Sequence, residues 1–344
     1  MPTLEIKVFA KINIGLKVFQ SRTSGYHDIE SIFQNVNLAD TIWISTSNKS
    51  NKARVTIEGD FGCPIESSSV YKAAIEFDRA TDGIIRRNGV HVQVGKEIPA
   101  QAGLGAASAD AAATLCGLNE LFGNRFSKKE LARISIRIGS DVPFFLFGEG
   151  AAIVRGRGER ISLIKPRTDF GIVILLPAWA SSTKDAYRLL DVMRRNGLSR
   201  IHSSTEVCEG ESTYRVCHSD GDLKKWYDGP IAYWHLGNDF QQVMEEQHRE
   251  YEVWSQLLID NGAVCTSLTG SGSAMYGVFE SMREADAAAE ECRNLIKRAE
   301  KSELCNIVSI FSVVPLARSM IVSYIQACNV DTRSDKERPC YGSD

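Results

Sequence analysis

A run of small residues lies between a predicted strand and a predicted helix, in the stretch Pro99-Ala-Gln-Ala-Gly-Leu-Gly-Ala-Ala-Ser-Ala-Asp-Ala-Ala112. Residues 90–94 alternate apolar and polar side chains, which predicts a strand. Apolar residues then recur at helical spacing as far as Phe122, and Gly123 is a typical helix stop. Backbone N–H groups and the helix dipole favour an anion at such a loop. The stretch therefore predicts either a phosphate-binding loop or a tight turn with close helix packing.

Two familiar nucleotide motifs do not fit this loop. A Walker loop needs Gly-Lys-Ser/Thr, and no lysine lies between Lys96 and Lys128. A dinucleotide fingerprint needs a third glycine, and this chain has Ser108 at that place. Neither a P-loop NTPase nor a Rossmann oxidoreductase is expected, so the loop has to be interpreted from the motifs that accompany it.

The bulk properties of the chain predict a two-domain protein of the cytoplasm. Its 344 residues exceed the usual size of one domain. A net charge of -3 and a pI near 6.1 do not favour nucleic acid or an anionic membrane as a partner. The nine cysteines include no C-x-x-C pair and the six histidines no H-E-x-x-H motif, which indicates reduced thiols and no structural metal. We expect neither a signal peptide nor a membrane span.

Residue patterns along the chain divide it into three parts: an N-terminal domain over 1–165, a C-terminal domain over 166–325 and a polar tail over 326–344. Residues 195–230 are polar and without a clear period, which predicts a long excursion on the surface of the second domain. Apolar patterns predict strands at 4–18, 41–46, 53–58, 90–94, 150–155, 172–176, 274–279 and 306–313. Helices are predicted at 68–80, 111–122 and 127–139, from 183 and from 281 onwards, and at 238–247 and 251–261.

Two charged residues stand beside apolar segments. Lys11 lies in the first predicted strand, on the face opposite Ile12 and Ile14, where it is either a solvated side chain or part of a site. Asp141 follows a predicted helix end at Gly139 and precedes an apolar stretch. Such an acid is either a partly desolvated carboxylate or a turn residue that bonds its own backbone. The local pattern leaves both alternatives open for each residue.

Five motifs occur in a fixed order along the chain: Ala10-Lys-Ile-Asn13, Gly25-Tyr-His27, the Pro99–Ala112 loop, Gly139-Ser-Asp-Val-Pro143 and Leu268-Thr-Gly-Ser-Gly-Ser273. Together they resemble the small-molecule kinase superfamily typified by galactokinase, homoserine kinase, mevalonate kinase and phosphomevalonate kinase. Within it the chain is most similar to the 4-diphosphocytidyl-2-C-methyl-D-erythritol kinase family. The resemblance runs through roughly residues 5–320 and is far more specific than one glycine loop.

The resemblance implies a two-domain α+β fold, with an N-terminal domain like that of ribosomal protein S5, a ferredoxin-like C-terminal domain and an active site between them. It implies that Asp141 takes the proton of the acceptor hydroxyl while Lys11 keeps Asp141 ionised and stabilises the alkoxide. It also implies Mg²⁺, with Ser108 as a possible hydroxyl ligand. ATP phosphates would lie on Pro99, Ala100, Gln101, Ala102, Gly103, Leu104, Gly105, Ala106, Ala107, Ser108 and Ala109.

The same resemblance implies a small-molecule substrate, a cytidine diphosphate derivative of methylerythritol that is phosphorylated on its 2-hydroxyl. Tyr26 would stack on the cytosine, with Tyr187 as the second aromatic, and His27 would supply hydrogen bonds. The remaining substrate contacts implied are Asn13 with the methylerythritol, Thr183 with the diphosphate, and the loop of Gly270, Ser271 and Gly272.

The chain departs from the family pattern in the loop itself, where family glycines are replaced by Gln101, Ala106 and Ala107 and a serine by Ala109. Because alanine tolerates positive φ poorly, we expect a somewhat different loop path or weaker ATP binding. Two alternatives remain at this point: another kinase of the superfamily, acting on mevalonate, homoserine or a sugar, or a non-catalytic metabolite-binding relative. We expect a monomer or a homodimer.

Overall fold

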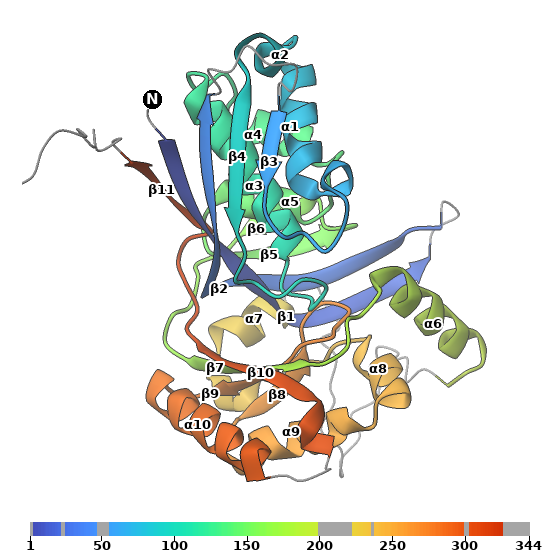
Figure 1. Ribbon diagram of the computed structural model, residues 1–344. Helices are drawn as coiled ribbons and strands as arrows, with labels where there is room; N and C mark the ends of the chain where they lie inside the picture. The colour runs from blue at the N-terminus through green and yellow to red at the C-terminus, as the bar shows by residue number, and fades with distance from the viewer. Residues whose placement is uncertain are drawn as a thin grey trace, which may run out of the picture.

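Two β-sheets organise the structure, a computed structural model that describes residues 3–21, 25–46, 55–198, 222–234, 237–298 and 303–325 (Figure 1). A sheet of seven strands forms the upper part of the molecule in Figure 1, and a sheet of four strands lies below it. Helices pack on both sheets. This is the two-part α+β architecture that the sequence predicts.

The first sheet is built on a long antiparallel hairpin. β1 (Thr3–Ser21) and β2 (His27–Thr46) pair from Leu4 opposite Ile44 to Ser21 opposite His27. The main strand order is β11-β1-β2-β4-β3, and β5 and β6 extend the sheet from the first half of β2. The other strands of this sheet are β3 (Val55–Glu58), β4 (Val90–Gly95), β5 (Ala151–Gly156), β6 (Arg160–Leu163) and β11 (Met320–Ile325).

Helices between β3 and β5 cover the buried face of this sheet and share one apolar core with it. The helix α3 approaches the strands very closely, since a Cβ added at Gly117 would lie 2.4 Å from Ile6 Cδ1. The predicted capping box of Ser127 and Glu130 is confirmed at the start of α4. The helices are α1 (Ser69–Ala80), α2 (Ile84–Asn88), α3 (Ala106–Leu121), α4 (Lys128–Ser135) and α5 (Val142–Phe147), with the short 3-10 turn η1 (Ile65–Ser67) before α1.

The second sheet has the antiparallel order β10-β7-β9-β8. α9 (Glu250–Asp260) and α10 (Met282–Arg298) cover its outer face and bury a core of their own with it. Its strands are β7 (Gly171–Pro177), β8 (Cys265–Leu268), β9 (Met275–Phe279) and β10 (Ile307–Val313). The remaining elements are α6 (Thr183–Arg195), α7 (Asp222–Asp228), α8 (Gln241–Gln247), η2 (Ile231–Tyr233) and η3 (Glu303–Asn306).

A third apolar cluster joins the two sheets. It combines Ile12 and Ile14 of β1 with Ile172 of β7 and Tyr276 of β9. The Tyr276 hydroxyl donates to the backbone carbonyl of Asn13 at 2.8 Å, with both groups buried. The middle of β1 therefore lies between the two sheets, and polar side chains on this part of β1 are withdrawn from bulk water.

Two segments differ from the expected domain organisation. β11 falls within 166–325, yet it pairs with β1 in the first sheet, so the chain returns to its starting domain. α7 falls within the expected surface excursion, but Leu223 and Tyr227 are buried in the cluster between the sheets, so for this part the surface prediction is wrong. The rest of the excursion, 199–221, and the tail 326–344 lie outside the described residues.

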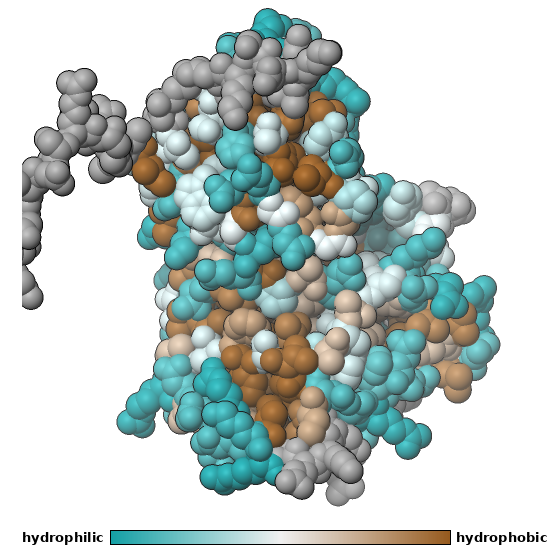
Figure 2. Space-filling view, viewed as in Figure 1, coloured by the Kyte–Doolittle hydropathy of each residue, from teal (hydrophilic) through white to brown (hydrophobic). Residues whose placement is uncertain are grey.

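The edge strands β10 and β11 carry exposed apolar side chains, and Figure 2 shows apolar areas among the hydrophilic ones on the face in view. These side chains are Val308, Ile321, Val322, Tyr324 and Ile325. Within the described parts of the chain, no helix combines the length and the apolar character needed to cross a bilayer.

Candidate active site

Lys11 is buried where the two sheets meet. Only 3% of the residue is exposed, and Nζ donates to Asn13 Oδ1 at 2.5 Å and to the carbonyl of Gly103 at 2.9 Å. The Phe33 ring lies below the ammonium, with its centroid 4.7 Å from Nζ. Burial lowers the pKa of Lys11, and the charge of Asp141 opposes part of that effect. Lys11 is therefore not a solvated strand residue.

Asp141 faces the same place from the helical side of the first domain. It is half-buried at the start of α5, and its side chain makes no capping hydrogen bond with that helix. Ser140 Oγ donates to Asp141 Oδ1 at 3.4 Å, and a Cβ on Gly158 would lie 2.9 Å from that oxygen. The charge of Asp141 opposes part of the lowering of the Lys11 pKa and adds to the effect of burial in raising the pKa of Tyr187.

The predicted phosphate loop runs beside Lys11. Gly103 and Gly105 have φ of 78° and 79°, a conformation that side chains other than glycine rarely adopt. A Cβ on Gly103 would lie 1.9 Å from the carbonyl oxygen of Thr269, whose Oγ1 donates to the Gly103 carbonyl at 3.0 Å. The loop is thus fixed between β1 and the segment after β8. It leads into α3, and the positive end of a helix dipole favours an anion at this place.

The alanines that replace family glycines do not strain this loop. Ala106 and Ala107, which replace glycines, and Ala109, which replaces a serine, all lie in the first turn of α3, a helical conformation that alanine adopts without strain. Gln101 is the position that takes a left-handed conformation, with φ of 54°. Its carbonyl accepts a hydrogen bond from the Ser181 N–H at 3.3 Å. Gln101 is therefore the substituted loop position with a backbone conformation that favours glycine, and the expected effect on ATP binding stays a prediction.

Ser108 also lies in the first turn of α3 and is half-buried. A Cβ added at Gly139 would lie 3.8 Å from Ser108 Oγ, so the hydroxyl faces the segment that leads to Asp141. Among the residues that the structure describes, no three His, Cys, Asp or Glu side chains form a group that could hold a metal ion. The hydroxyl of Ser108 suits a Mg²⁺ ion whose other ligands are phosphate oxygens and water.

Helix α6 brings Thr183 and Tyr187, four residues apart, to one side of the site. Thr183 Oγ1 lies 3.0 Å from Ser271 Oγ. The Tyr187 ring stacks on His27 with centroids 4.8 Å apart and meets the edge of Phe240 at 4.9 Å. Burial, and to a smaller extent Asp141, raises the pKa of Tyr187 to about 12, so it remains a neutral phenol.

Tyr26 and His27 occupy different surroundings, although they are adjacent in the chain. Tyr26 is 54% exposed, and Arg157 Cζ lies 4.3 Å from its ring centroid. His27 is buried, and its Nε2 lies 2.8 Å from Asp191 Oδ1. The ring that stacks on Tyr187 is therefore that of His27 and not that of Tyr26, whose own ring faces the guanidinium group of Arg157.

The Gly270-Ser-Gly272 loop after β8 closes the site against the phosphate loop. A Cβ on Gly270 would lie 3.2 Å from Gly103 Cα. Asn238 Nδ2 donates to the Gly270 carbonyl and Ser181 Oγ to the Ser271 carbonyl, each at 2.8 Å. Direct contacts thus join the Lys11 segment of β1, the predicted phosphate loop, the Gly270-Ser-Gly272 loop and the start of α6, while Tyr26 is exposed.

This arrangement has the parts that transfer of a phosphoryl group to an alcohol requires. A half-buried carboxylate can accept a proton from a hydroxyl, and a buried ammonium can stabilise the oxygen that is left. A helix N-terminus beside them can hold the phosphates, so little else is needed besides positioning.

Comparison with known proteins identifies the family. Residues 68–149 match the GHMP kinases N terminal domain family. The 4-diphosphocytidyl-2-C-methyl-D-erythritol kinase of Thermodesulfovibrio yellowstonii is 34% identical over 83% of this chain and 93% of its own length. The kinase of the same name from Alkaliphilus metalliredigens is 32% identical over 87% of this chain and 95% of its own length. The chain belongs to the 4-diphosphocytidyl-2-C-methyl-D-erythritol kinase family.

Solved structures show the same fold for this family and for related kinases. A crystal structure titled 4-(cytidine 5'-diphospho)-2C-methyl-D-erythritol kinase covers 90% of this chain and 98% of its own, with a TM-score of 0.69 and 24% identity. The homoserine kinase from Cytophaga hutchinsonii covers 94% of this chain and 97% of its own, with a TM-score of 0.65 and 17% identity. The fold is thus shared across the superfamily, while the closer sequence similarity is to the 4-diphosphocytidyl-2-C-methyl-D-erythritol kinases.

Three residues that the sequence did not predict as site residues contact residues that it did predict. Thr269 binds the Gly103 carbonyl, Asp191 binds His27, and Arg157 lies over Tyr26. Asp191 follows Tyr187 by four residues on α6, so the helical period could have indicated it. Thr269 and Arg157 lie in turns, and no periodicity points to them.

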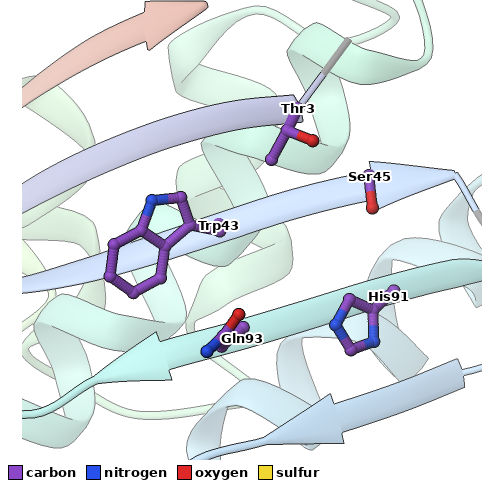
Figure 3. Close-up of a pocket in the computed structure, with 5 residues that line it drawn as sticks. All are labelled: Thr3, Trp43, Ser45, His91 and Gln93. Carbon is purple, nitrogen blue, oxygen red and sulfur yellow. The ribbon is translucent and has the colours of Figure 1, made fainter. Parts of the chain in front are cut away.

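A separate shallow cavity of about 280 Å³ lies on the strands β1, β2 and β4 (Figure 3). None of the predicted site residues lines it. Its walls carry no formally charged side chain, and the Trp43 indole in it donates to Glu5 at 2.8 Å. The residues that line it are Thr3, Trp43, Ser45, His91 and Gln93. It is therefore not part of the kinase site.

Proposed function

We propose that this chain transfers the γ-phosphoryl group of ATP to the 2-hydroxyl of 4-diphosphocytidyl-2-C-methyl-D-erythritol, a step in isoprenoid precursor synthesis by the non-mevalonate pathway. One observation carries the proposal: buried Lys11 donates to the carbonyl of Gly103 in the predicted phosphate loop, and the charge of half-buried Asp141 acts on the Lys11 ammonium. Membership of the family names the substrate class, and the similarity covers most of the chain.

The two charged residues divide the work of the chemical step. Asp141 accepts the proton of the 2-hydroxyl, whose oxygen forms a bond to the γ-phosphorus as the bond to the β-phosphate oxygen breaks. Lys11 favours the ionised form of Asp141 and stabilises the developing alkoxide. Its hydrogen bonds to Asn13 and Gly103 fix the ammonium in place, so little reorganisation is needed during reaction.

ATP and Mg²⁺ fit the residues of the loop. The left-handed glycines let the loop backbone pass close to Lys11 and Thr269, and the N-terminus of α3 that follows favours the negative charge of phosphate oxygens. Ser108 would hold Mg²⁺ together with those oxygens. The metal ion neutralises negative charge on the phosphates when bound.

The cytidine part of the substrate would lie at the aromatic residues of the hairpin and α6. Tyr26, His27 and Tyr187 offer flat rings for a base, and Thr183 and Ser271 offer hydroxyls for a diphosphate. Because Tyr187 stacks on His27 in this structure, a base that enters between Tyr26 and Tyr187 has to move Arg157 or the His27 ring. A cytoplasmic location and a monomeric or homodimeric state stay predictions.

The proposal is tested by coupled ADP release with purified protein, ATP and Mg²⁺. We expect ADP release with 4-diphosphocytidyl-2-C-methyl-D-erythritol, and background rates with mevalonate, homoserine and galactose. Phosphorylation of one of the latter but not of the cytidylyl compound would replace the assigned substrate. Substrate binding without any ADP release would indicate a metabolite-binding protein that has lost the reaction.

A further inference from the structure

The imidazole of His27 is held on two sides by α6. Its Nε2 lies 2.8 Å from Asp191 Oδ1, and its ring stacks on Tyr187 at 4.8 Å with 23° between the planes. The His27 side chain is 6% exposed and that of Asp191 32% exposed. The ring therefore has little freedom to turn, and its nitrogens have fixed directions.

The carboxylate of Asp191 determines which ring nitrogen carries the hydrogen. An ionised carboxylate only accepts hydrogen bonds, so Nε2 of His27 has to be the donor. In a neutral imidazole the other nitrogen, Nδ1, is then an acceptor. An Asn at position 191 would not impose this choice, because an amide offers both a donor and an acceptor.

We infer that Asp191 is a positioning residue that sets the specificity for cytosine by holding His27 in the tautomer with an acceptor at Nδ1. This inference rests on the proposed function, which supplies a cytidine substrate. Cytosine carries an amino donor at C4, where uracil carries a carbonyl acceptor. An acceptor at Nδ1 accepts a hydrogen bond from the amino group of cytosine and repels the carbonyl oxygen of uracil. A site built to accept an N–H group rejects the analogue that lacks it.

The helix that carries Asp191 is anchored to the hairpin tip, and Figure 1 shows α6 beside the outer ends of β1 and β2. Arg194 Nη2 donates to the carbonyl of Val18 at 2.6 Å and to Asp239 at 3.0 Å. Ser182 Oγ accepts from the Asp185 N–H and caps the start of α6. Because these contacts do not involve Asp191, replacing its side chain leaves the helix in place.

The first experiment measures kcat/KM for the cytidylyl substrate and for its uridylyl analogue in wild type, Asp191→Asn and Asp185→Asn. Asp185 lies on the same helix but is exposed and paired only with Arg188 at the surface, so it is the matched control. We expect the wild type and Asp185→Asn to prefer cytidine strongly. In Asp191→Asn the ratio of kcat/KM for the cytidylyl substrate to that for the uridylyl analogue should fall at least tenfold. The change should lie in KM rather than kcat, and part of it should be a higher kcat/KM for the uridylyl analogue. An unchanged preference would overturn the inference.

The second experiment reads the tautomer directly by ¹⁵N NMR of the histidine side chains, with His27 assigned from a His27→Gln variant. The wild type should show a protonated Nε2 and an unprotonated Nδ1, and Asp191→Asn a mixture. Two protonated nitrogens, or a proton on Nδ1 in the wild type, would contradict the inference. If the wild type does not phosphorylate the cytidylyl substrate at all, the proposed function fails instead, whereas the NMR result still decides the role of Asp191.

Discussion

At the scale of single residues, the site depends on how closely backbone and side chains approach Lys11. The ammonium is buried, and its hydrogen bonds go to Asn13 and to the carbonyl of Gly103. The same carbonyl accepts from Thr269 of the second domain. Gly103 therefore joins the predicted phosphate loop, Lys11 and the segment that follows β8 through one carbonyl group.

Replacing Gly103 with alanine should damage both stability and activity. The new Cβ would lie 1.9 Å from the Thr269 carbonyl oxygen, and φ is 78°. Positive φ costs about 1–2 kcal/mol for alanine, and overpacking adds about 1–3 kcal/mol. Gly123→Ala is the control, because Gly123 has φ of 85° but no atom within 4 Å of a new Cβ. Urea denaturation should show the larger loss for Gly103→Ala; equal losses would mean that the loop moves aside freely.

Sequence motifs predict Lys11, Asp141 and the phosphate loop as site residues, because phosphoryl transfer constrains residue types at such places. They could not identify the partners of these residues. Thr269 lies 166 residues after Gly103 in the chain, and the meeting of the two depends on how the sheets pack. The pairing of His27 with Tyr187 likewise depends on where α6 docks.

At the scale of elements, a buried charge cluster connects β2, the segment after β4 and α3. Lys96 lies between Asp40 and Asp110 and donates to both carboxylates. Asp40 Oδ1 also accepts from the N–H groups of Glu97 and Ile98, just before the phosphate loop. Asp110 Oδ1 is buried without a hydrogen-bond partner. The cluster thus fixes the residues before the predicted phosphate loop, and the carboxylate of Asp110 within it is poorly solvated.

Asp110 should make the protein less stable as the pH rises from about 4 to about 7. Burial first, and then the charge of Asp40, raises the pKa of Asp110 to about 7, above its ordinary value of 3.8. The folded state therefore binds more protons than the unfolded state in this window, and stability falls with rising pH. The free energy of unfolding of Asp110→Asn should exceed that of wild type by a margin that grows by on the order of 1–4 kcal/mol from pH 4 to pH 8.

Urea titrations of the two proteins at several pH values check this expectation. A margin that does not change with pH would mean that Asp110 stays ionised throughout the range. A margin that shrinks as pH rises would mean that the attraction to Lys96 outweighs the cost of burial.

Strands and helices were predictable from the sequence where a regular apolar pattern extends over many residues, and less so elsewhere. The strand 4–18 and the helix 68–80 are confirmed within a few residues. The first half of β2 was not predicted as a strand, because buried Ser31, Gln34 and Asn35 interrupt its apolar alternation. These polar residues bond to backbone and to neighbouring strands rather than to water, which a sequence pattern does not reveal.

At the scale of the whole molecule, the two sheets share one apolar cluster, and the chain crosses between them twice. β11 returns to pair with β1, and the cluster between the sheets includes residues of β1, β7 and α7. The two halves therefore stabilise each other, and the site at their junction exists only when both are folded.

Because of this shared cluster, urea should unfold the protein in a single transition, whether it is followed by fluorescence of Trp43 in the first sheet or of Trp254 against the second. Two separate transitions would show that the domains fold independently.

Tyr276→Phe should lower the free energy of unfolding by about 1–3 kcal/mol, since it leaves the Asn13 carbonyl buried without its donor. Tyr233→Phe is the control, as Tyr233 is 70% exposed.

The most direct test of the account replaces Asp141 with asparagine and measures binding and turnover separately. Asparagine keeps the shape of the side chain but cannot accept the proton of the substrate hydroxyl. We expect unchanged thermal unfolding and calorimetric affinities for ATP and for the cytidylyl substrate within a few-fold of wild type. ADP release should fall by about 10²–10⁴-fold, the usual contribution of a general base. Turnover close to that of wild type would contradict the assignment of Asp141 and, with it, the reaction proposed for this site.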